Sequence, residues 1–264
     1  MNDLNKLDDM VLASPRMNAD VAHGMHVPQS WVGLRREAVS RQSGLPMRLP
    51  RKGGALVQGG ERRQRHLMAK RVFDVVMSGL ALCAMLPLLI IISALIKVSS
   101  AGPVFFRQER EGYRGRPFQM LKFRSMRLED CDLSGVAQTI QDDPRVTPIG
   151  RFIRRTSIDE LPQLINVFMG NMTLVGPRPH VAGMRAGNMV YKELVPYYDL
   201  RLEMVPGLTG WAQANGLRGP TNRADRARAR IDHDIAYIQN FSFWLDIKII
   251  ALTLRHEFLG GSGH

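Results

Sequence analysis

The sequence predicts a membrane-attached protein of the α/β (α+β) class, and three observations lead to this prediction. The chain has 264 residues, of which 45% are hydrophobic, so it can bury a sizeable core. A long uncharged stretch, Val75 to Ile96, has the length and composition of a membrane helix. The rest of the chain combines short apolar runs typical of strands with segments of helical periodicity.

Residues 1–66 precede these patterned segments and show no sustained periodicity. They mix Met, Pro, Gly, Ser and Arg, and they contain turn signals such as Gly53-Gly54 and Gly59-Gly60. A segment of this kind does not bury enough apolar surface to offset the entropy of ordering. We therefore expect residues 1–66 to form a flexible N-terminal tail.

The net charge of +12 indicates an anionic partner, and nucleic acid, anionic lipid and phosphorylated substrates all fit that description. Proteins that bind single-stranded nucleic acid commonly stack bases on aromatic side chains, and aromatic residues make up only 7% of this chain. The composition therefore favours lipid and phosphorylated substrates over nucleic acid and does not exclude nucleic acid.

The membrane segment is compatible with two arrangements. At ~1.5 Å per residue, Val75–Ile96 reaches about 33 Å, enough for a tilted helix that spans the bilayer core. Pro87 lies in its middle, however, and proline breaks or kinks a helix. Both flanks are also basic, and Lys and Arg normally mark the cytoplasmic side. A re-entrant helix that turns at Pro87 and leaves by the face it entered satisfies both flanks, so both arrangements stay open.

Beyond the membrane segment, the pattern predicts a hairpin followed by helices. Val104–Phe106 and Phe118–Leu121 are apolar runs joined by a glycine-containing loop, which is typical of a β-hairpin. Thr147–Arg155 predicts a short amphipathic helix that lies either in the membrane interface or on the protein's own core. Three further helices and a glycine-rich, strand-like turn are expected, the helices over residues 181–204, 232–240 and 244–258 and the turn over 205–216.

A tandem acidic pair, Asp159-Glu160, stands between basic residues and a short apolar segment. Pro162 fits best within the first turn of a helix, which would make Asp159 the N-cap residue. Ser157 is a competing cap, because it forms a Ser-x-x-Glu capping box with Glu160. Either cap puts a carboxylate where free amides favour negative charge, so we expect Asp159 to be ionised. An ordinary capped helix with a charged first turn explains the same residues.

Adjacent carboxylates among arginines also suit phosphate chemistry. An ionised aspartate attacks phosphorus directly and forms an acyl phosphate. Carboxylate and phosphate repel each other, and Mg²⁺ held by Asp159 and Glu160 would relieve that repulsion. Lys122, Arg154 and Arg178 are candidates for neutralising the remaining charge. Ordinary surface charges, or contacts with anionic lipid, are the alternative roles of these residues.

Seven short motifs follow one another in a fixed order between residues 68 and 258. They are Lys70-Arg71-Val72-Phe73-Asp74, Gly102-Pro103-Val104-Phe105-Phe106-Arg107-Gln108, Lys122-Phe123-Arg124-Ser125-Met126, Asp143-Pro144-Arg145-Val146-Thr147, Thr156-Ser157-Ile158-Asp159-Glu160-Leu161-Pro162-Gln163-Leu164, Val175-Gly176-Pro177-Arg178-Pro179 and Pro206-Gly207-Leu208-Thr209-Gly210-Trp211-Ala212-Gln213. Together they resemble the bacterial sugar transferase family, the monotopic polyprenol-phosphate phosphoglycosyl transferases of the exopolysaccharide-initiating type.

The resemblance implies a monotopic membrane protein with a re-entrant helix-break-helix over residues 67–99. A small cytoplasmic catalytic domain with interfacial amphipathic helices would follow over residues 100–264. The implied reaction moves a phospho-sugar from a UDP-sugar to undecaprenyl phosphate, releases UMP and forms undecaprenyl-diphospho-sugar. This is the first membrane step of exopolysaccharide or glycoconjugate synthesis, on the cytoplasmic face of the bacterial inner membrane.

The resemblance also implies the roles of individual residues. Asp159 would be the nucleophile of a ping-pong cycle, Glu160 its partner and Lys122 a further catalytic residue, with Mg²⁺ as the cofactor at Asp159 and Glu160. The implied substrate-binding residues are Arg154, Pro177, Arg178, Pro179, Arg218 and Asp234. Nucleic acid is not an expected partner, and a homodimer is compatible with the family.

The sequence departs from the family pattern at two places. Leu86-Pro87 stands where many relatives have Ser-Pro, so the serine that would support the broken backbone of the membrane helix is missing. Some relatives carry an arginine directly after the residue that corresponds to Gly216, and here Arg218 would serve instead. Loops 127–143 and 216–230 are the expected specificity loops, and neither carries a recognisable code for the sugar.

Overall fold

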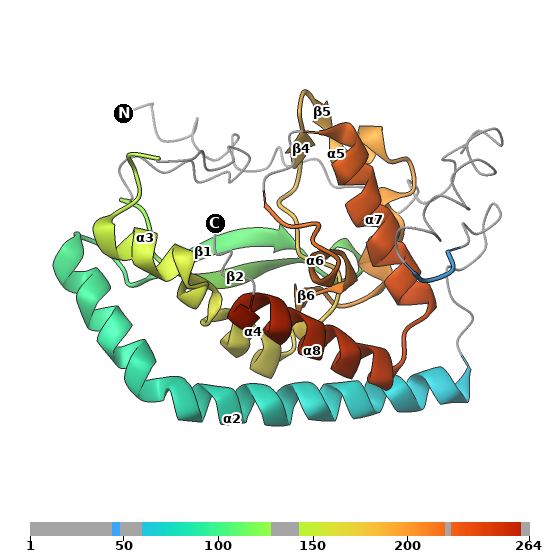
Figure 1. The fold of residues 1–264 in the computed structure, drawn as a ribbon, viewed down its shortest axis with the longest axis horizontal. Coiled ribbons are helices and arrows are strands. Elements are labelled where there is room, and N and C mark those ends of the chain that lie inside the picture. The colour runs from blue at the N-terminus through green and yellow to red at the C-terminus, as the bar shows by residue number, and fades with distance from the viewer. Residues whose placement is uncertain (1–43, 48–59, 128–142, 220–222, 260–264) are drawn as a thin grey trace, which may run out of the picture.

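The computed structural model describes residues 44–47, 60–127, 143–219 and 223–259, and the structural statements concern these residues. Helices and short strands alternate along the chain (Figure 1). The helices are α2 (Glu61–Ser99), η2 (Tyr113–Gly115), α3 (Pro148–Arg155), η4 (Ile158–Glu160), α4 (Gln163–Met169), α5 (Tyr191–Leu194), η5 (Tyr198–Glu203), α6 (Trp211–Ala214), α7 (Ala224–Gln239) and α8 (Phe243–Leu259). The strands are β1 (Phe105–Glu111), β2 (Pro117–Phe123), β3 (Thr173–Val175), β4 (Arg185–Ala186), β5 (Met189–Val190) and β6 (Gly207–Thr209).

The long helix α2 runs along one edge of the molecule and then bends back beside α3 (Figure 1). The bend lies in the teal part of the ribbon. The helix contains Pro87, and a proline inside a helix removes a backbone hydrogen bond and favours a kink. Among the described residues, α2 is the one helix long and apolar enough to cross a membrane. It begins at Glu61, before the expected boundary at residue 67, so the basic flank belongs to the same helix.

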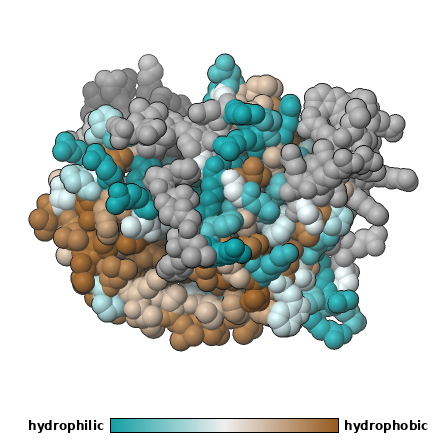
Figure 2. Space-filling model, in the orientation of Figure 1, coloured by the Kyte–Doolittle hydropathy of each residue, from teal (hydrophilic) through white to brown (hydrophobic). Residues whose placement is uncertain are grey.

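Apolar side chains of α2 remain exposed along most of its length, and Figure 2 shows this hydrophobic surface along the lower left of the molecule. Phe152 of α3 and Phe168 of α4 extend the exposed apolar surface beyond α2. A contiguous surface of this size is typical of a membrane contact. Ile153, the neighbour of Phe152, is fully buried, so helix α3 packs on the protein core and also exposes an aromatic ring.

The predicted hairpin is confirmed, and its strands are longer than expected. β1 and β2 pair antiparallel from Phe105 opposite Phe123 to Glu111 opposite Pro117. Directly opposed residues share a face, so Lys122 and Met120 of β2 lie on the same side of the hairpin as Phe106 and Gln108 of β1. Met120 is buried against α4 in a small apolar cluster, and this face of the hairpin therefore covers α4.

The glycine-rich turn contains a strand that the sequence pattern identified only as a strand-like centre. β6 pairs in parallel with β3, with Thr173 opposite Gly207. Glycine is required at this pairing, because a Cβ on Gly207 would lie 2.1 Å from the Gly176 nitrogen. A Cβ on Gly210 would lie 2.3 Å from the Gly176 oxygen. This close packing fixes the backbone that leads into residues 177–179.

The expectation of a helix over residues 181–204 is wrong. The segment forms the two-residue strands β4 and β5, the short helix α5 and the 3-10 helix η5. Gly183 and Gly187 have φ angles of 71° and 58°, which a right-handed helix cannot contain. Buried tyrosines of this segment face α7 in the main core, which Met47 also joins. Leu45 and Met47 of the expected flexible tail therefore pack on the core, and residues 1–43 and 48–59 lie outside the described residues.

Buried polar contacts attach α2 to the rest of the fold near both of its ends. Near the N-terminal end, Lys70 donates to the Val175 carbonyl at 2.7 Å and forms an ion pair with Asp246 at 2.6 Å. Asp74 accepts hydrogen bonds from the Thr173 hydroxyl and the Leu174 amide, both in β3.

Near the other end, the Arg124 guanidinium donates to the carbonyls of Ser100 and Ala101 at 2.7 and 2.6 Å. Arg124 is 3% exposed, and it follows the last residue of β2. Charged donors at a helix C-terminus satisfy carbonyls that have no partner within the helix. Helix α2 is thus joined to β2 as well as to β3.

Candidate active site

Asp159 lies in the 3-10 turn η4, and it is not the N-cap of a helix as the sequence pattern predicted. Helix α4 begins later, at Gln163, with Pro162 as its N-cap residue. The capping box is also wrong, because the Ser157 side chain makes no cap hydrogen bond. Ser157 instead adopts φ 56° and ψ 14°, a left-handed conformation that costs a non-glycine residue on the order of 1 kcal/mol. This turn directs the chain inward, and Asp159 is only 8% exposed.

Glu160 is held between two cationic side chains from different elements. Lys122 of β2 contacts its carboxylate at 2.7 Å, and Arg178 contacts it at 2.6 Å. Burial would raise the pKa of Glu160, but Arg178 and Lys122 outweigh burial and hold that pKa well below its usual range. Glu160 is therefore an anion at neutral pH. It joins the hairpin, η4 and the loop after β3 in one cluster.

The pKa of Asp159 is raised, contrary to the expectation that a helix end favours its ionised form. Burial is the largest cause, and Lys122 opposes it, while the charge of Glu160 adds to it. Arg154 and Arg178 also lower the pKa, but they do not cancel the effect of burial. Asp159 makes neither a hydrogen bond nor an ion pair through its carboxylate within the described part of the chain. Its oxygens are therefore available to a ligand.

Arg178 is positioned by a second arginine that the sequence analysis did not identify. Arg201 of η5 is 2% exposed, and its guanidinium donates to the Arg178 carbonyl. The same guanidinium forms an ion pair with Asp234 of α7 at 2.8 Å. Asp234 was predicted to bind substrate, and the structure places it behind the Arg178 backbone, 4% exposed. No short-range sequence pattern links residues 178, 201 and 234, so only the fold reveals this connection.

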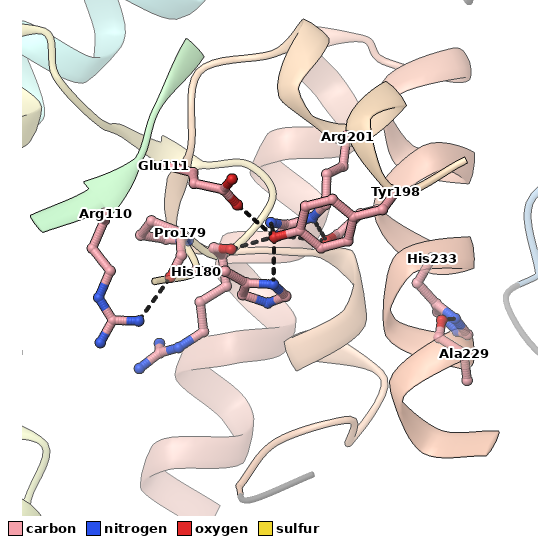
Figure 3. A network of polar contacts seen from close by, with 10 residues as sticks. Arg110, Glu111, Pro179, His180, Tyr198, Arg201, Ala229 and His233 are labelled. Carbon is pink, nitrogen blue, oxygen red and sulfur yellow. Dashed lines mark hydrogen bonds and ion pairs between the residues drawn. The ribbon is translucent and has the colours of Figure 1, made fainter. Parts of the chain in front are cut away.

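The network around Arg201 continues through Tyr198 to Glu111, the last residue of β1 (Figure 3). The Tyr198 hydroxyl donates to Glu111 at 2.8 Å and lies 3.0 Å from the His180 ring. Burial, with Arg201 and other arginines, lowers the pKa of His180 well below its usual value. His180 is thus neutral at physiological pH, and it belongs to the packing behind residues 177–179.

The remaining predicted residues lie at different distances from the acidic pair. Arg154 lies in the last turn of α3, close enough to lower the pKa of Asp159. Pro177 and Pro179 flank Arg178, and their carbonyls accept hydrogen bonds from Gly207 and Arg110. Arg218 lies in the loop after α6, where its Nε donates to the Gln213 carbonyl. Pro87 lies inside helix α2.

The residues at this site fit a magnesium ion only in part. No cluster of three or more His, Cys, Asp or Glu side chains exists in the described ranges. Mg²⁺ usually takes one or two carboxylates and completes its shell with water and substrate phosphates. Asp159 meets that requirement, because its carboxylate is not committed to a cation. Glu160 meets it less well, because Lys122 and Arg178 already contact its oxygens.

The arrangement as a whole suits an anionic phosphate ligand. Asp159 and Glu160 are surrounded by Lys122, Arg154 and Arg178, so positive charge exceeds negative charge. The Asp159 carboxylate is the one acidic group of the pair without an ion-pair partner among the described residues. A phosphate group beside it would meet a nucleophile and several cations at once.

Comparisons with known proteins agree with this chemistry. A family model described as bacterial sugar transferase matches residues 65–260. The exopolysaccharide production protein PSS of Rhizobium leguminosarum bv. phaseoli is 52% identical over 197 residues, covering 75% of this chain and 98% of that protein.

Two further relatives carry names that state an activity. The undecaprenyl-phosphate glucose phosphotransferase of Komagataeibacter xylinus is 50% identical over 72% of this chain and 36% of that protein. The UDP-glucose:undecaprenyl-phosphate glucose-1-phosphate transferase of Escherichia coli (strain K12) is 46% identical over 75% of this chain and 42% of that protein. The chain therefore spans less than half the length of these two relatives.

Proposed function

The chain belongs to the bacterial sugar transferase family, and from that premise we propose that it transfers a sugar phosphate from a nucleotide sugar to a polyprenyl phosphate. The observation that carries the proposal is the uncommitted carboxylate of Asp159, buried beside Glu160 among Lys122, Arg154 and Arg178. The exposed apolar surface of α2 supports a membrane-borne acceptor. A purely structural acidic pair would not require an unpaired buried carboxylate.

The names of the relatives support specific substrates. Two of them act, by name, with undecaprenyl phosphate and glucose, and the Escherichia coli protein is named for UDP-glucose. We therefore propose undecaprenyl phosphate as the acceptor and UDP-glucose as the first donor to test. The name of the Rhizobium relative supports a place in exopolysaccharide production.

In the first proposed step, a carboxylate oxygen of Asp159 attacks the phosphorus that carries the sugar. The bond between that phosphorus and the oxygen bridging the two phosphates breaks. UMP leaves with the bridging oxygen, and an acyl phosphate joins Asp159 to the phospho-sugar. Lys122 and Arg178 lie close enough to stabilise charge on the phosphoryl oxygens, and they also hold Glu160 as an anion.

In the second proposed step, a phosphate oxygen of undecaprenyl phosphate attacks the same phosphorus. The acyl phosphate bond breaks, Asp159 regains its carboxylate, and undecaprenyl-diphospho-sugar is released. Asp159 must be deprotonated for the first step, and its raised pKa places that requirement at a higher pH than for an ordinary aspartate. Burial of the reacting carboxylate also removes water that would compete for it.

Mg²⁺ is the proposed cofactor, because its charge would reduce the repulsion between the Asp159 carboxylate and the donor phosphates. Asp159 would hold it together with phosphate oxygens of the donor, and Glu160 would join only by giving up one of its cationic partners.

The proposed location is the cytoplasmic face of the bacterial inner membrane. Helix α2 would enter one leaflet and leave by the same face, with its bend at Pro87 inside the membrane. Basic residues on both flanks support this arrangement, because both ends of the helix carry the mark of the cytoplasmic side.

The experiment measures UMP release by the purified protein in detergent or nanodiscs, with a panel of UDP-sugars. Each donor is tested with and without undecaprenyl phosphate, and with and without EDTA. A ping-pong enzyme releases one UMP per protein without acceptor and turns over only with it. Release that depends on acceptor even in the first turnover would argue for direct transfer. No UMP from any donor would overturn the proposed activity.

A further inference from the structure

Arg110 of β1 is a cationic residue near the acidic pair that the sequence analysis did not single out. Neighbouring residues of a strand face opposite sides, and its neighbour Glu111 binds Tyr198 and Lys192 on one side of β1. Arg110 points to the other side, where its guanidinium donates to the Pro179 carbonyl at 3.4 Å (Figure 3). The guanidinium also donates to the Gln108 side chain. It therefore lies against the backbone that carries Arg178.

The charge of Arg110 has no carboxylate partner in the described part of the chain. It forms no ion pair, and its Nε is buried without a hydrogen-bond partner. The two acceptors it does have, a carbonyl and an amide oxygen, are neutral. A guanidinium offers five donors in a planar fork that matches phosphate, so Arg110 retains donor capacity that the protein does not use.

The position of Arg110 extends the cationic surface of the site in one direction. Lys122 and Arg110 share one face of the hairpin. Arg110 of β1 lies opposite Phe118 of β2, and Phe118 is four residues before Lys122 in the same strand. At ~3.3 Å per residue this separates them by about 13 Å. Arg178 lies between Lys122 and Arg110. It forms an ion pair with Glu160, as Lys122 does, and its charge lowers the pKa of Arg110.

The electrostatic surroundings of Arg110 support an anionic ligand. Burial and the charge of Arg178 lower the pKa of Arg110 to about 10, with Glu160 opposing them. Arg110 is therefore still charged at neutral pH, next to another cation and without a counterion of its own. Glu160 cannot serve both, since Lys122 and Arg178 already contact it. A phosphate placed between Arg110 and Arg178 would balance this charge.

We propose that Arg110 binds a phosphate group of a substrate, at the end of the site opposite Lys122. The proposal rests on the proposed function, since it assigns Arg110 to the phosphates of the same reaction. Those phosphates come from two sources, the diphosphate of the nucleotide sugar and the phosphate of the polyprenyl acceptor. Both offer the same oxygen acceptors, and kinetics distinguishes them.

The test compares Arg110→Gln and Arg110→Lys with Arg116→Gln, an exposed arginine of the same hairpin that serves as the control. In a ping-pong reaction, kcat/KM for the donor reports only the first step and kcat/KM for the acceptor only the second. Arg110→Gln should lower one of these values about 10- to 100-fold, the usual loss for a hydrogen bond to a charged group. Arg110→Lys should lose less, and Arg116→Gln should stay within about twofold.

A binding measurement separates this proposal from the proposed function. Pyrophosphate should raise the melting temperature of the wild-type protein whether or not the protein turns over, and Arg110→Gln should weaken that rise while Arg116→Gln keeps it. Should Arg110→Gln fail to fold, Arg110→Lys takes its place, because it keeps the charge and loses only the planar fork. Kinetics and pyrophosphate stabilisation equal to those of Arg116→Gln in both Arg110 variants would overturn the proposal.

Discussion

At the scale of single residues, Asp159 is under two opposing influences. Burial favours its neutral form, and Lys122, Arg154 and Arg178 favour its charged form. Burial prevails, so the pKa of Asp159 is higher in the folded protein than in the unfolded chain. The folded state therefore binds this proton more tightly, and the associated stabilisation is lost as the pH rises through the folded pKa. Once ionised, the buried Asp159 carboxylate destabilises the fold that holds it.

Asp159→Asn should therefore raise the melting temperature at neutral pH and lower UMP release at least about a thousandfold. Asparagine resembles the neutral acid in shape but cannot attack phosphorus. The measurements are thermal unfolding and UMP release at pH 7, with Asp199→Asn, an exposed aspartate, as the control. Turnover equal to wild type would rule out Asp159 as the nucleophile, and a lower melting temperature would contradict the electrostatic argument.

Glu160→Gln should have the opposite effect on stability. It leaves Lys122 and Arg178 without their shared anion, which should cost roughly 2 kcal/mol, less than for a fully buried pair because Arg178 is partly exposed. Because the pKa of Glu160 is depressed in the folded protein, the ionised carboxylate stabilises the fold above pH 4.5, and this stabilisation is lost as the pH falls. Chemical unfolding at several pH values should therefore show that the difference in unfolding free energy between wild type and Glu160→Gln becomes smaller below pH 4.5. Glu193→Gln, at an exposed glutamate, provides the control, and a gap that is constant with pH would refute the assignment.

The sequence predicted part of this site. The family resemblance put Lys122, Glu160 and Arg178 at one site, and the structure joins them by ion pairs. Local capping rules misplaced Asp159, because they assume a helix start where the chain makes a left-handed turn at Ser157. Arg110 and Arg201 were not predicted as site residues. Their partners Pro179 and Asp234 are distant in sequence, and no spacing rule connects them.

At the scale of elements, local patterns predicted local structure and missed long-range pairing. The hairpin and helices α3 and α8 follow from apolar runs and helical periodicity, and all three are confirmed. The parallel pairing of β3 with β6 depends on a close approach of Gly176 to Gly207, which no local pattern reveals. Residues 181–204 resemble a helix in composition, but two glycines with positive φ divide them.

The attachment of α2 to β3 gives a prediction at this scale. Lys70→Met should remove the buried ion pair with Asp246 and destabilise the protein by about 3–5 kcal/mol, because it leaves a buried carboxylate without its cation. Turnover should also fall, since Lys70 binds the Val175 carbonyl two residues before Pro177. Unfolding by denaturant in detergent measures the first effect and UMP release the second.

A matched control for this prediction lies five residues earlier in the same helix. Arg65→Met removes the exposed pair with Glu61, which should change stability by less than about 1 kcal/mol. The double variant Lys70→Met with Asp246→Leu should recover part of the lost stability, because no buried charge then remains. Equal effects of Lys70→Met and Arg65→Met would show that the buried pair has no special role.

At the scale of the whole molecule, the apolar surface and the bend of α2 predict the topology in the membrane. Reporter tags at residue 60 and at the C-terminus should both lie on the cytoplasmic side, because both flanks of the membrane segment are basic. Pro87→Leu should straighten the helix and shift part of the population to a spanning orientation. Finding the two tags of the unaltered protein on opposite sides would establish a spanning helix.

The attachment of α2 at both ends also means that the membrane helix is not a removable anchor. Ile92 and Ile96 fill one apolar cluster with Phe123 and Ile153, and Lys70 and Asp74 satisfy groups of β3 and α8. A shortened chain that starts after Ser99 would expose that cluster and leave Asp246 without its cation. Solubilising this protein therefore calls for added lipid or detergent, since truncation would remove part of its interior.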